Sequence, residues 1–136
     1  MRVMHRVPIL VLLLAALTGC AAPQVDETGG WLRTELYFAI ARAGEVDASA
    51  LARWQRFLDE EVTARFPDGF TVLEGYGQWR LPGGTDVGRL ESRVIVILHP
   101  DDTDARGRVA AIRRVWKVQT GQQSVLRATQ PADVSF

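Results

Sequence analysis

The sequence predicts an α+β fold: a ferredoxin-like βαββαβ domain with a four-stranded antiparallel sheet and two helices on one face. Three observations predict it. Short segments alternate apolar and polar residues, two longer segments repeat apolar residues at spacings of three and four, and these segments follow one another as β-α-β-β-α-β without an internal repeat. Right-handed crossover connections then favour the strand order 4-1-3-2.

The first half of the predicted domain is a strand followed by an amphipathic helix. The strand spans residues 31–40, where polar and apolar residues alternate. Its exposed side is predicted to carry Arg33, Glu35 and Tyr37. Asp47 is suited to cap a helix over residues 47–65, in which apolar residues recur on one face. Pro67 and Gly69 then stop the helix and turn the chain.

The second half contains the other strands and the second helix. Residues 70–80 and 91–99 are predicted to form two strands joined by a glycine-rich connection. Asp102 is suited to cap the following helix, and Gly121 suits the left-handed position that ends it. A last strand over residues 124–129 completes the predicted sheet.

The strand over residues 70–80 is unusual because two of its alternating positions are glycines. We expect Gly75 and Gly77 to face the helices together with Leu73 and Trp79, since glycine lets a neighbouring element approach the sheet closely. A β-bulge at either glycine would reverse this assignment. The residues predicted to lie on the open face are Arg33, Glu35, Tyr37, Glu74, Tyr76, Gln78, Arg80, Glu91, Arg93, Ile95, Ile97, His99 and Arg127.

This open face is the predicted ligand-binding surface of the protein. Arginine side chains can hold an anionic ligand with bidentate geometry. The alternative is that they form cross-strand ion pairs with glutamates on a solvated sheet. The candidate ligand-binding residues are Arg33, Glu35, Tyr37, Glu74, Tyr76, Gln78, Arg80 and Arg93.

Catalytic and metal-binding sets are scarce. The only cysteine is Cys20, and His99 is the only histidine outside the N-terminal segment, so a catalytic triad is not expected. No metal site and no cofactor is predicted, because the ligand spacings and glycine-rich nucleotide motifs are absent. His99 beside Glu74 is a candidate general base and Tyr76 a second catalytic candidate. The alternative for His99 is a polar strand end before Pro100.

The first residues have the pattern of an export signal. Arg2 and Arg6 precede an apolar run over residues 7–17, which is shorter than the roughly 20 residues that a helix needs to cross a bilayer. The run ends in Leu17-Thr18-Gly19-Cys20, which resembles the lipobox of bacterial lipoproteins, where the cysteine thiol is lipidated after cleavage before Cys20. The chain is therefore divided into a signal peptide (1–19), a lipidated cysteine and flexible tether (20–30), a single α+β domain (31–130) and a C-terminal tail (131–136).

The lipobox implies where the protein is found. The resemblance implies acyl chains such as palmitate on Cys20 and a place in the cell envelope, facing the periplasm or the exterior. Ala21 after the cysteine favours the outer membrane where a cell has two membranes. The 16 basic residues balance 16 acidic ones, and removal of Arg2 and Arg6 with the signal peptide leaves a slight acidic excess. This charge balance excludes a nucleic-acid binder.

Several short runs, taken in order, resemble an uncharacterised family of small bacterial lipoproteins with a domain of unknown function. The resemblance covers residues 30–130, and Ala64 stands where a proline is expected. The family implies no established catalytic residues. The runs that carry the resemblance are Arg33-Thr34-Glu35-Leu36-Tyr37-Phe38, Val62-Thr63-Ala64-Arg65-Phe66-Pro67-Asp68-Gly69, Gly75-Tyr76-Gly77-Gln78-Trp79-Arg80, Glu91-Ser92-Arg93-Val94 and Gln122-Gln123-Ser124-Val125-Leu126.

Three functions remain open from the sequence. The favoured one is a non-enzymatic, membrane-anchored envelope lipoprotein whose open sheet face binds a partner or forms a homodimer. The alternative is a cofactor-independent enzyme of the dimeric α+β barrel type, with a pocket near His99. The third is a sensor of small solutes that uses the same arginines.

Overall fold

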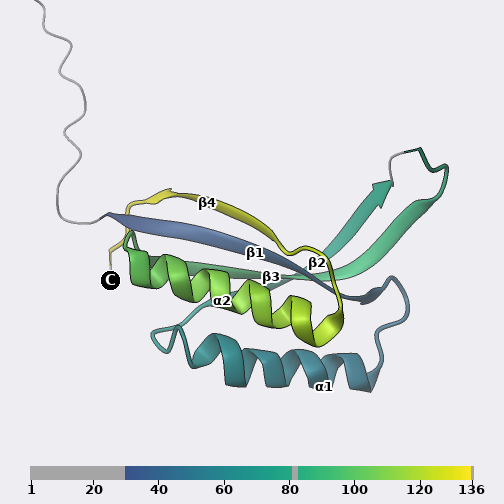
Figure 1. Ribbon diagram of the computed structural model, residues 1–136, viewed down its shortest axis with the longest axis horizontal. Coiled ribbons are helices and arrows are strands. Elements are labelled where there is room, and N and C mark those ends of the chain that lie inside the picture. The colour runs from purple at the N-terminus through teal and green to yellow at the C-terminus, as the bar shows by residue number, and fades with distance from the viewer. Residues whose placement is uncertain (1–29, 81–82, 136) are drawn as a thin grey trace, which may run out of the picture.

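The computed structural model describes residues 30–80 and 83–135 and has the predicted α+β fold (Figure 1). One antiparallel sheet contains four strands in the order β2-β3-β1-β4, which is the predicted order. The strands are β1 (Trp31–Arg42), β2 (Thr71–Arg80), β3 (Val87–Pro100) and β4 (Leu126–Ala132). The predicted signal peptide, Cys20 and the tether up to residue 29 lie outside the described residues.

Both helices lie on the same side of the sheet, so its other face is left open (Figure 1). The first helix, α1 (Ala48–Phe57), continues into the π-helical segment η1 (Leu58–Thr63), and α2 (Thr103–Thr120) is the second helix. Within the described ranges, no helix combines the length and the hydrophobicity needed to cross a membrane.

Side chains and a glycine define the helix ends as predicted. Asp47 accepts a 2.8 Å hydrogen bond from the backbone N–H of Ala50, and Asp102 accepts one of 2.7 Å from Ala105. The hydrogen bond from Ala50 holds the pKa of the Asp47 carboxyl below its usual range. Gly121 ends α2 with a φ of 71°, a conformation that favours glycine. Both helices therefore begin, and α2 ends, where local chemistry predicts, whereas the predicted helix over residues 47–65 is α-helical only to Phe57 and π-helical from Leu58 to Thr63.

Aromatic rings fill the space between the sheet and the helices. The ring of Phe38, on β1, lies 5.4 Å from Trp54, 5.4 Å from Phe57 and 5.5 Å from Trp116 between centroids. Such pairs contribute about 0.5–1.5 kcal/mol each beyond their buried area. The indole N–H of Trp116 donates a 3.2 Å hydrogen bond to Gln122, whose amide donates in turn to the backbone of β1. This packing anchors the end of α2 to the centre of the sheet.

The hydrophobic core lies wholly within the domain. Every residue of the buried cluster falls between residues 36 and 125. A chain that starts at residue 21 therefore keeps the whole buried cluster of the described residues, and it is the form used in the experiments below.

The register of β3 decides which of its side chains face the helices. Ile95 lies opposite Leu36 and Ile97 opposite Thr34, and direct partners in an antiparallel sheet share a face. Ile95 and Ile97 are fully buried, so this is the helix side. His99 shares that side and is also buried. The predicted placement of Ile95, Ile97 and His99 on the open face is therefore wrong.

The register of β2 also reverses the predicted orientation. Gly75 lies opposite Ser92 and Trp79 opposite Gly88, which places the glycines of β2 on the open face, not toward the helices. Strand pairing has a period of two, so this difference moves every side chain of the strand to the other face. The residues predicted on the open face but found on the helix side are Glu74, Tyr76, Gln78, Arg80, Glu91, Arg93 and Arg127.

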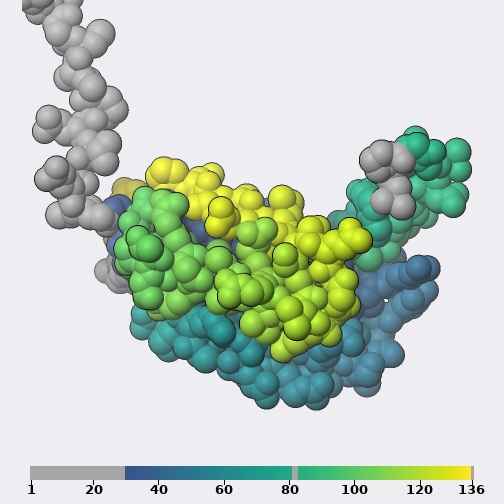
Figure 2. Space-filling model, viewed as in Figure 1, coloured from purple at the N-terminus to yellow at the C-terminus, as the bar shows by residue number. Residues whose placement is uncertain are grey.

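The paired ends of β2 and β3 project beyond the helices as an arm (Figures 1 and 2). Tyr76 and Trp79, on this arm, are 57% and 43% exposed. The close approach that a glycine permits occurs here at Gly88, because a Cβ on this residue would lie 2.6 Å from the ring of Trp79. The Trp79 ring thus covers bare backbone of the neighbouring strand.

Candidate functional site

An apolar row crosses the open face of the sheet. Leu73, Val94, Tyr37 and Leu126 come from β2, β3, β1 and β4 and are successive cross-strand partners. Leu73 is 47%, Tyr37 36% and Leu126 64% exposed. Contiguous exposed apolar side chains on a protein surface mark interaction sites. We refer to these four residues as the apolar row.

Charge is almost absent from the open face around this row. In the described part of the sheet where β1 pairs with both neighbours, from Trp31 to Tyr37, the charged side chains on this face are Arg33 and Glu35 alone. The predicted polar face therefore does not form, because its other charged residues lie on the helix side. The open face suits an apolar partner.

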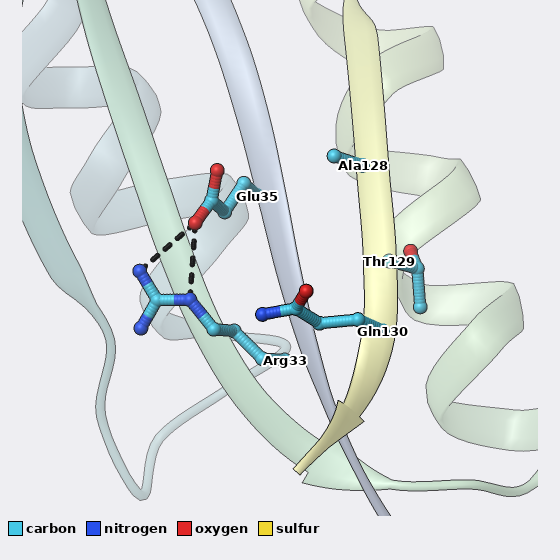
Figure 3. Close-up of a pocket in the computed structure, with 5 residues that line it drawn as sticks. All are labelled: Arg33, Glu35, Ala128, Thr129 and Gln130. Carbon is cyan, nitrogen blue, oxygen red and sulfur yellow. Dashed lines mark hydrogen bonds and ion pairs between the residues drawn. The ribbon is translucent and has the colours of Figure 1, made fainter.

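Arg33, Glu35 and Tyr37 form a connected group on this face, as the alternation of β1 predicts, and Figure 3 shows the contact between Arg33 and Glu35. Two guanidinium nitrogens of Arg33, Nε and Nη2, lie 3.0 and 2.9 Å from Oε1 of Glu35. The Tyr37 hydroxyl donates a 2.5 Å hydrogen bond to Oε2. Gln130 points to the same side and Thr129 away from it (Figure 3), and the group borders a hollow of about 100 Å³.

These contacts change the proton affinities of two side chains. The hydrogen bond from Tyr37 and then the contact with Arg33 hold the pKa of the Glu35 carboxyl below its usual range. The same hydrogen bond raises the pKa of the Tyr37 hydroxyl, because the ionised tyrosine would face the carboxylate. At neutral pH the group is a fixed ion pair with a neutral phenol beside it, and it carries no net charge.

The remaining ligand-binding candidates lie on the other side of the sheet. Arg93 and Glu74 are direct partners and form a 3.0 Å ion pair, with side chains that are 11% and 83% exposed. Tyr76 and Gln78 lie beside them on the arm, with a long 3.4 Å hydrogen bond between their side chains, and Arg80 ends the strand. The structure thus separates the predicted residues into two groups on opposite faces.

His99 is held in a buried chain of hydrogen bonds. Its Nδ1 lies 2.8 Å from the carbonyl oxygen of Pro100 and its Nε2 lies 2.9 Å from the hydroxyl of Thr34, which is 3.0 Å from that of Thr129. A carbonyl only accepts, so Nδ1 carries a proton, and in the neutral ring Nε2 accepts from Thr34. Both ring nitrogens are therefore engaged. The predicted pairing of His99 with Glu74 is wrong, because Glu74 pairs with Arg93.

A second hollow lies at the end of β3 beside His99, where the sequence analysis expected a pocket only for its alternative, enzymatic function. This cleft has a volume of about 450 Å³ and contains Phe66 and Phe70 from the segment before β2 and Arg108 from α2. No spacing in the sequence marks these residues as a set, because they come from separate elements. Among the described residues, no group of three or more histidine, cysteine or acidic side chains could hold a metal ion.

Comparisons with known proteins agree with this fold. The family described as "Protein of unknown function (DUF3574)" matches residues 33–136. No curated protein gives a significant match. A phage SAM lyase in complex with S-methyl-5'-thioadenosine has a TM-score of 0.58 at 14% identity, over 76% of this chain and 82% of the lyase.

Two further solved structures are similar. The phage SAM lyase in its apo state has a TM-score of 0.52 at 14% identity, over 76% of this chain and 81% of the lyase. The CutA protein from Synechococcus elongatus has a TM-score of 0.48 at 10% identity, over 77% of this chain and 79% of CutA. At these identities, the likeness to the lyase shows a shared fold alone.

Proposed function

The chain belongs to the family of proteins of unknown function called DUF3574, and we propose that it is a lipid-anchored module of the bacterial cell envelope that pairs with a second copy of itself through the open face of its sheet. The observation that carries the pairing is the apolar row, which spans all four strands without a covering layer in the described structure. A sheet with one apolar face is stable when that face is packed against another layer.

A second copy is the partner that the charges of this face favour. Arg33 and Glu35 are the charged residues of the open face between Trp31 and Tyr37, and they neutralise each other. Two identical faces therefore meet without net repulsion, as an isologous two-fold interface requires. Burying a leucine such as Leu126 from both copies contributes about 1.5–3 kcal/mol per side chain.

The anchor part of the proposal rests on the N-terminal sequence. Leu17-Thr18-Gly19-Cys20 resembles a lipobox, and stable attachment to a membrane takes two or more acyl chains. The domain starts at β1, whose first residue lies at the end of the sheet opposite the arm (Figure 1). A tether at this position leaves both the apolar row and the arm free to meet another copy.

Sedimentation equilibrium of the chain from residue 21 tests the pairing. We expect a monomer–dimer equilibrium whose dissociation constant rises at least about tenfold in Leu126→Asp, because a carboxylate would have to be desolvated in the interface. Val118→Asp is the matched control, since Val118 is 79% exposed on α2, on the other side of the sheet. A monomeric wild type at millimolar concentration, or equal weakening by both substitutions, would refute the pairing.

The proposal does not extend to catalysis. His99 lines the cleft at the end of β3, and its ring nitrogens contact the Thr34 hydroxyl and the Pro100 carbonyl, an arrangement that identifies no reaction. The other candidate, Tyr76, lies on the arm at 57% exposure. The cleft beside His99 is compatible with the alternative, an enzyme of the dimeric α+β barrel type, whereas the apolar row favours a docking module.

A further inference from the structure

The cleft at the end of β3 exists because β2 starts late. Thr71, the first residue of β2, pairs with Val96, but β3 continues to Pro100. The last residues of β3 are therefore paired with β1 on one side and have no strand on the other. The cleft of about 450 Å³ lies where a strand paired with the end of β3 would otherwise run, a position that we call the vacant lane. Its size falls in the range of pockets that hold small organic molecules.

Apolar side chains form much of the cleft wall. Trp31 and Leu98 contribute from the ends of β1 and β3, and Phe66 and Phe70 from the segment that leads into β2. Leu98, which pairs with β1 on one side only, is 42% exposed. Such a wall favours an aromatic or alkyl group in the cleft.

Hydrogen-bond donors without partners point to the chemistry of the other end of the ligand. Asp101, the residue after β3, donates its backbone N–H to the carbonyl of Gly30, the residue before β1, over 2.8 Å. Because hydrogen-bonded and non-hydrogen-bonded pairs alternate along antiparallel strands, the odd-numbered residues of β3 are those that bond to β1. The N–H and C=O of Leu98 consequently point into the vacant lane, where no described strand pairs with them. A ligand that accepts a hydrogen bond from Leu98 would satisfy this edge.

Arg108 adds a charged donor to the same cleft. Its guanidinium lies 5.1 Å from the centre of the Phe66 ring, with Nη1 bonded to the carbonyl of Arg65 and Nη2 to Asp104. Its Nε is buried and has no hydrogen-bond partner among the described residues. The Arg108 side chain as a whole is 38% exposed and lines the cleft, so its guanidinium is available to a bound carboxylate. Arg33 brings a second guanidinium to the cleft.

We propose that this cleft binds a small organic monocarboxylate, with its apolar body against Phe66, Phe70 and Trp31 and its carboxylate at Arg108 and the Leu98 amide. One charge fits better than two, because Asp68 also lines the cleft and would repel a dianion. This site is separate from the apolar row, and it is present in a single chain whether or not two copies pair.

Heteronuclear NMR titration with 3-phenylpropionate tests the proposal on the chain from residue 21. The expected result is saturable binding, with shifts in the Leu98 backbone amide and the Arg108 Nε–H signal. Two other compounds separate the parts of the ligand: 3-phenylpropan-1-ol keeps the apolar body without the charge, and propionate keeps the charge without the body. Both should bind at least about tenfold more weakly, because each loses one set of contacts.

Matched arginine variants locate the carboxylate. Arg108→Met should weaken 3-phenylpropionate binding at least about tenfold and Arg108→Lys less, since a lysine keeps the charge but not the Nε–H. Arg114→Met is the control, because Arg114 lies on the same helix, is exposed and is not part of the cleft. The Arg108→Lys variant keeps the test valid should Arg108→Met lose stability.

Three outcomes would overturn the proposal: no saturation at millimolar acid, equal affinity for the acid and the alcohol, or equal effects of the Arg108 and Arg114 substitutions. Repeating the titration with Leu126→Asp separates this site from self-pairing, because Leu126 lies on β4 and is not part of the cleft. Binding should persist in that variant even where the dimer is lost.

Discussion

Leu73 and Leu126 stand on the two edge strands of the sheet, yet they belong to one cross-strand row on its open face. Val94 and Tyr37 connect them across β3 and β1. Leu73, Tyr37 and Leu126 of this row are exposed, and the charged residues of this face between Trp31 and Tyr37 in the described sheet, Arg33 and Glu35, neutralise each other. This arrangement is the physical basis for the proposed pairing of two copies.

The buried chain through His99 predicts a specific loss of stability. In Thr34→Val the hydroxyl that donates to His99 Nε2 is replaced by a methyl group of similar size, which leaves a buried ring nitrogen without a partner. The free energy of unfolding should fall by about 1–3 kcal/mol in urea denaturation. Thr129→Val should cost less, because Thr34 can still donate to His99. Equal stability of Thr34→Val and the wild type would contradict the assigned hydrogen bonds.

The contact between Trp79 and Gly88 predicts that alanine destabilises the domain at Gly88 but not at Gly75. Gly88→Ala places a methyl group 2.6 Å from the Trp79 ring and should lower the free energy of unfolding by about 1–3 kcal/mol, while shifting the tryptophan emission. Gly75→Ala is the control, since its Cβ would meet its nearest atom at 3.8 Å. If Gly88→Ala proved as stable as Gly75→Ala, Trp79 would not be held over β3.

The group around Glu35 predicts a pH dependence. Folding lowers the pKa of Glu35, so its contribution to stability is present above the unfolded pKa of about 4.3 and is lost as the pH falls through the lower, folded value. The pKa of Tyr37 shifts in the opposite direction, because folding raises it. The contribution of Tyr37 to stability is therefore present below a pH of about 10 and is lost as the pH rises through the folded value.

NMR titration of the Glu35 carboxyl carbon in Tyr37→Phe tests the cause of this shift. The hydrogen bond from Tyr37 is the largest cause, so the pKa of Glu35 should rise toward its usual range in the variant but stay below it, because Arg33 remains. The urea midpoint of the wild type, measured against pH, should depend on Glu35 only in the acidic range. An unchanged Glu35 pKa in Tyr37→Phe would show that Arg33 alone sets it.

The N-terminal motif predicts lipid attachment through Cys20. Expressed as the full chain in a bacterium fed with radiolabelled palmitate, the wild type should carry label and partition into detergent after Triton X-114 phase separation. Cys20→Ser should carry no label, because the thiol that accepts the lipid is gone. Ser49→Ala, a substitution within the domain, is a control that should be labelled normally. Label on Cys20→Ser would refute the anchor but leave the pairing untouched.

Local chemistry made much of the fold predictable. Asp47 and Gly121 mark helix ends by capping and by a left-handed backbone, and both act as predicted. The side of β1 that faces the helices was predictable because Leu36 and Phe38 alternate with the polar residues Glu35 and Tyr37. The strand order followed from the element order and the handedness of the crossovers.

The faces of β2 and β3 were not predictable from alternation. β3 has apolar residues on both of its faces, so their alternation does not indicate which face packs against the helices. Val94, Val96 and Leu98 lie on the open face, and Ile95 and Ile97 lie under the helices. β2 has too few apolar residues to choose for itself, and it takes the face that its pairing with β3 imposes. The predicted polar site depended on this choice.

The sequence offered a pocket near His99 only as part of an alternative function, and the other residues of the cleft could not be predicted for a different reason. The cleft arises from the different lengths of β2 and β3 at one end of the sheet, and its residues come from strands, a turn and α2. Only the folded chain brings Phe66 and Arg108 together. The backbone edge at Leu98 is left without a neighbouring strand because of where β2 begins to pair with β3, and this register has no signature in the amino-acid sequence.

Intermolecular NOEs test the central claim most directly. Isotope-labelled and unlabelled copies of the chain from residue 21 are mixed at a concentration where both are associated, and filtered spectra report only contacts between copies. The account predicts NOEs from the methyl groups of Leu73, Val94 and Leu126 to the Tyr37 ring of the other copy. Intermolecular NOEs confined to Val118 and the helix side, or none at all, would contradict it.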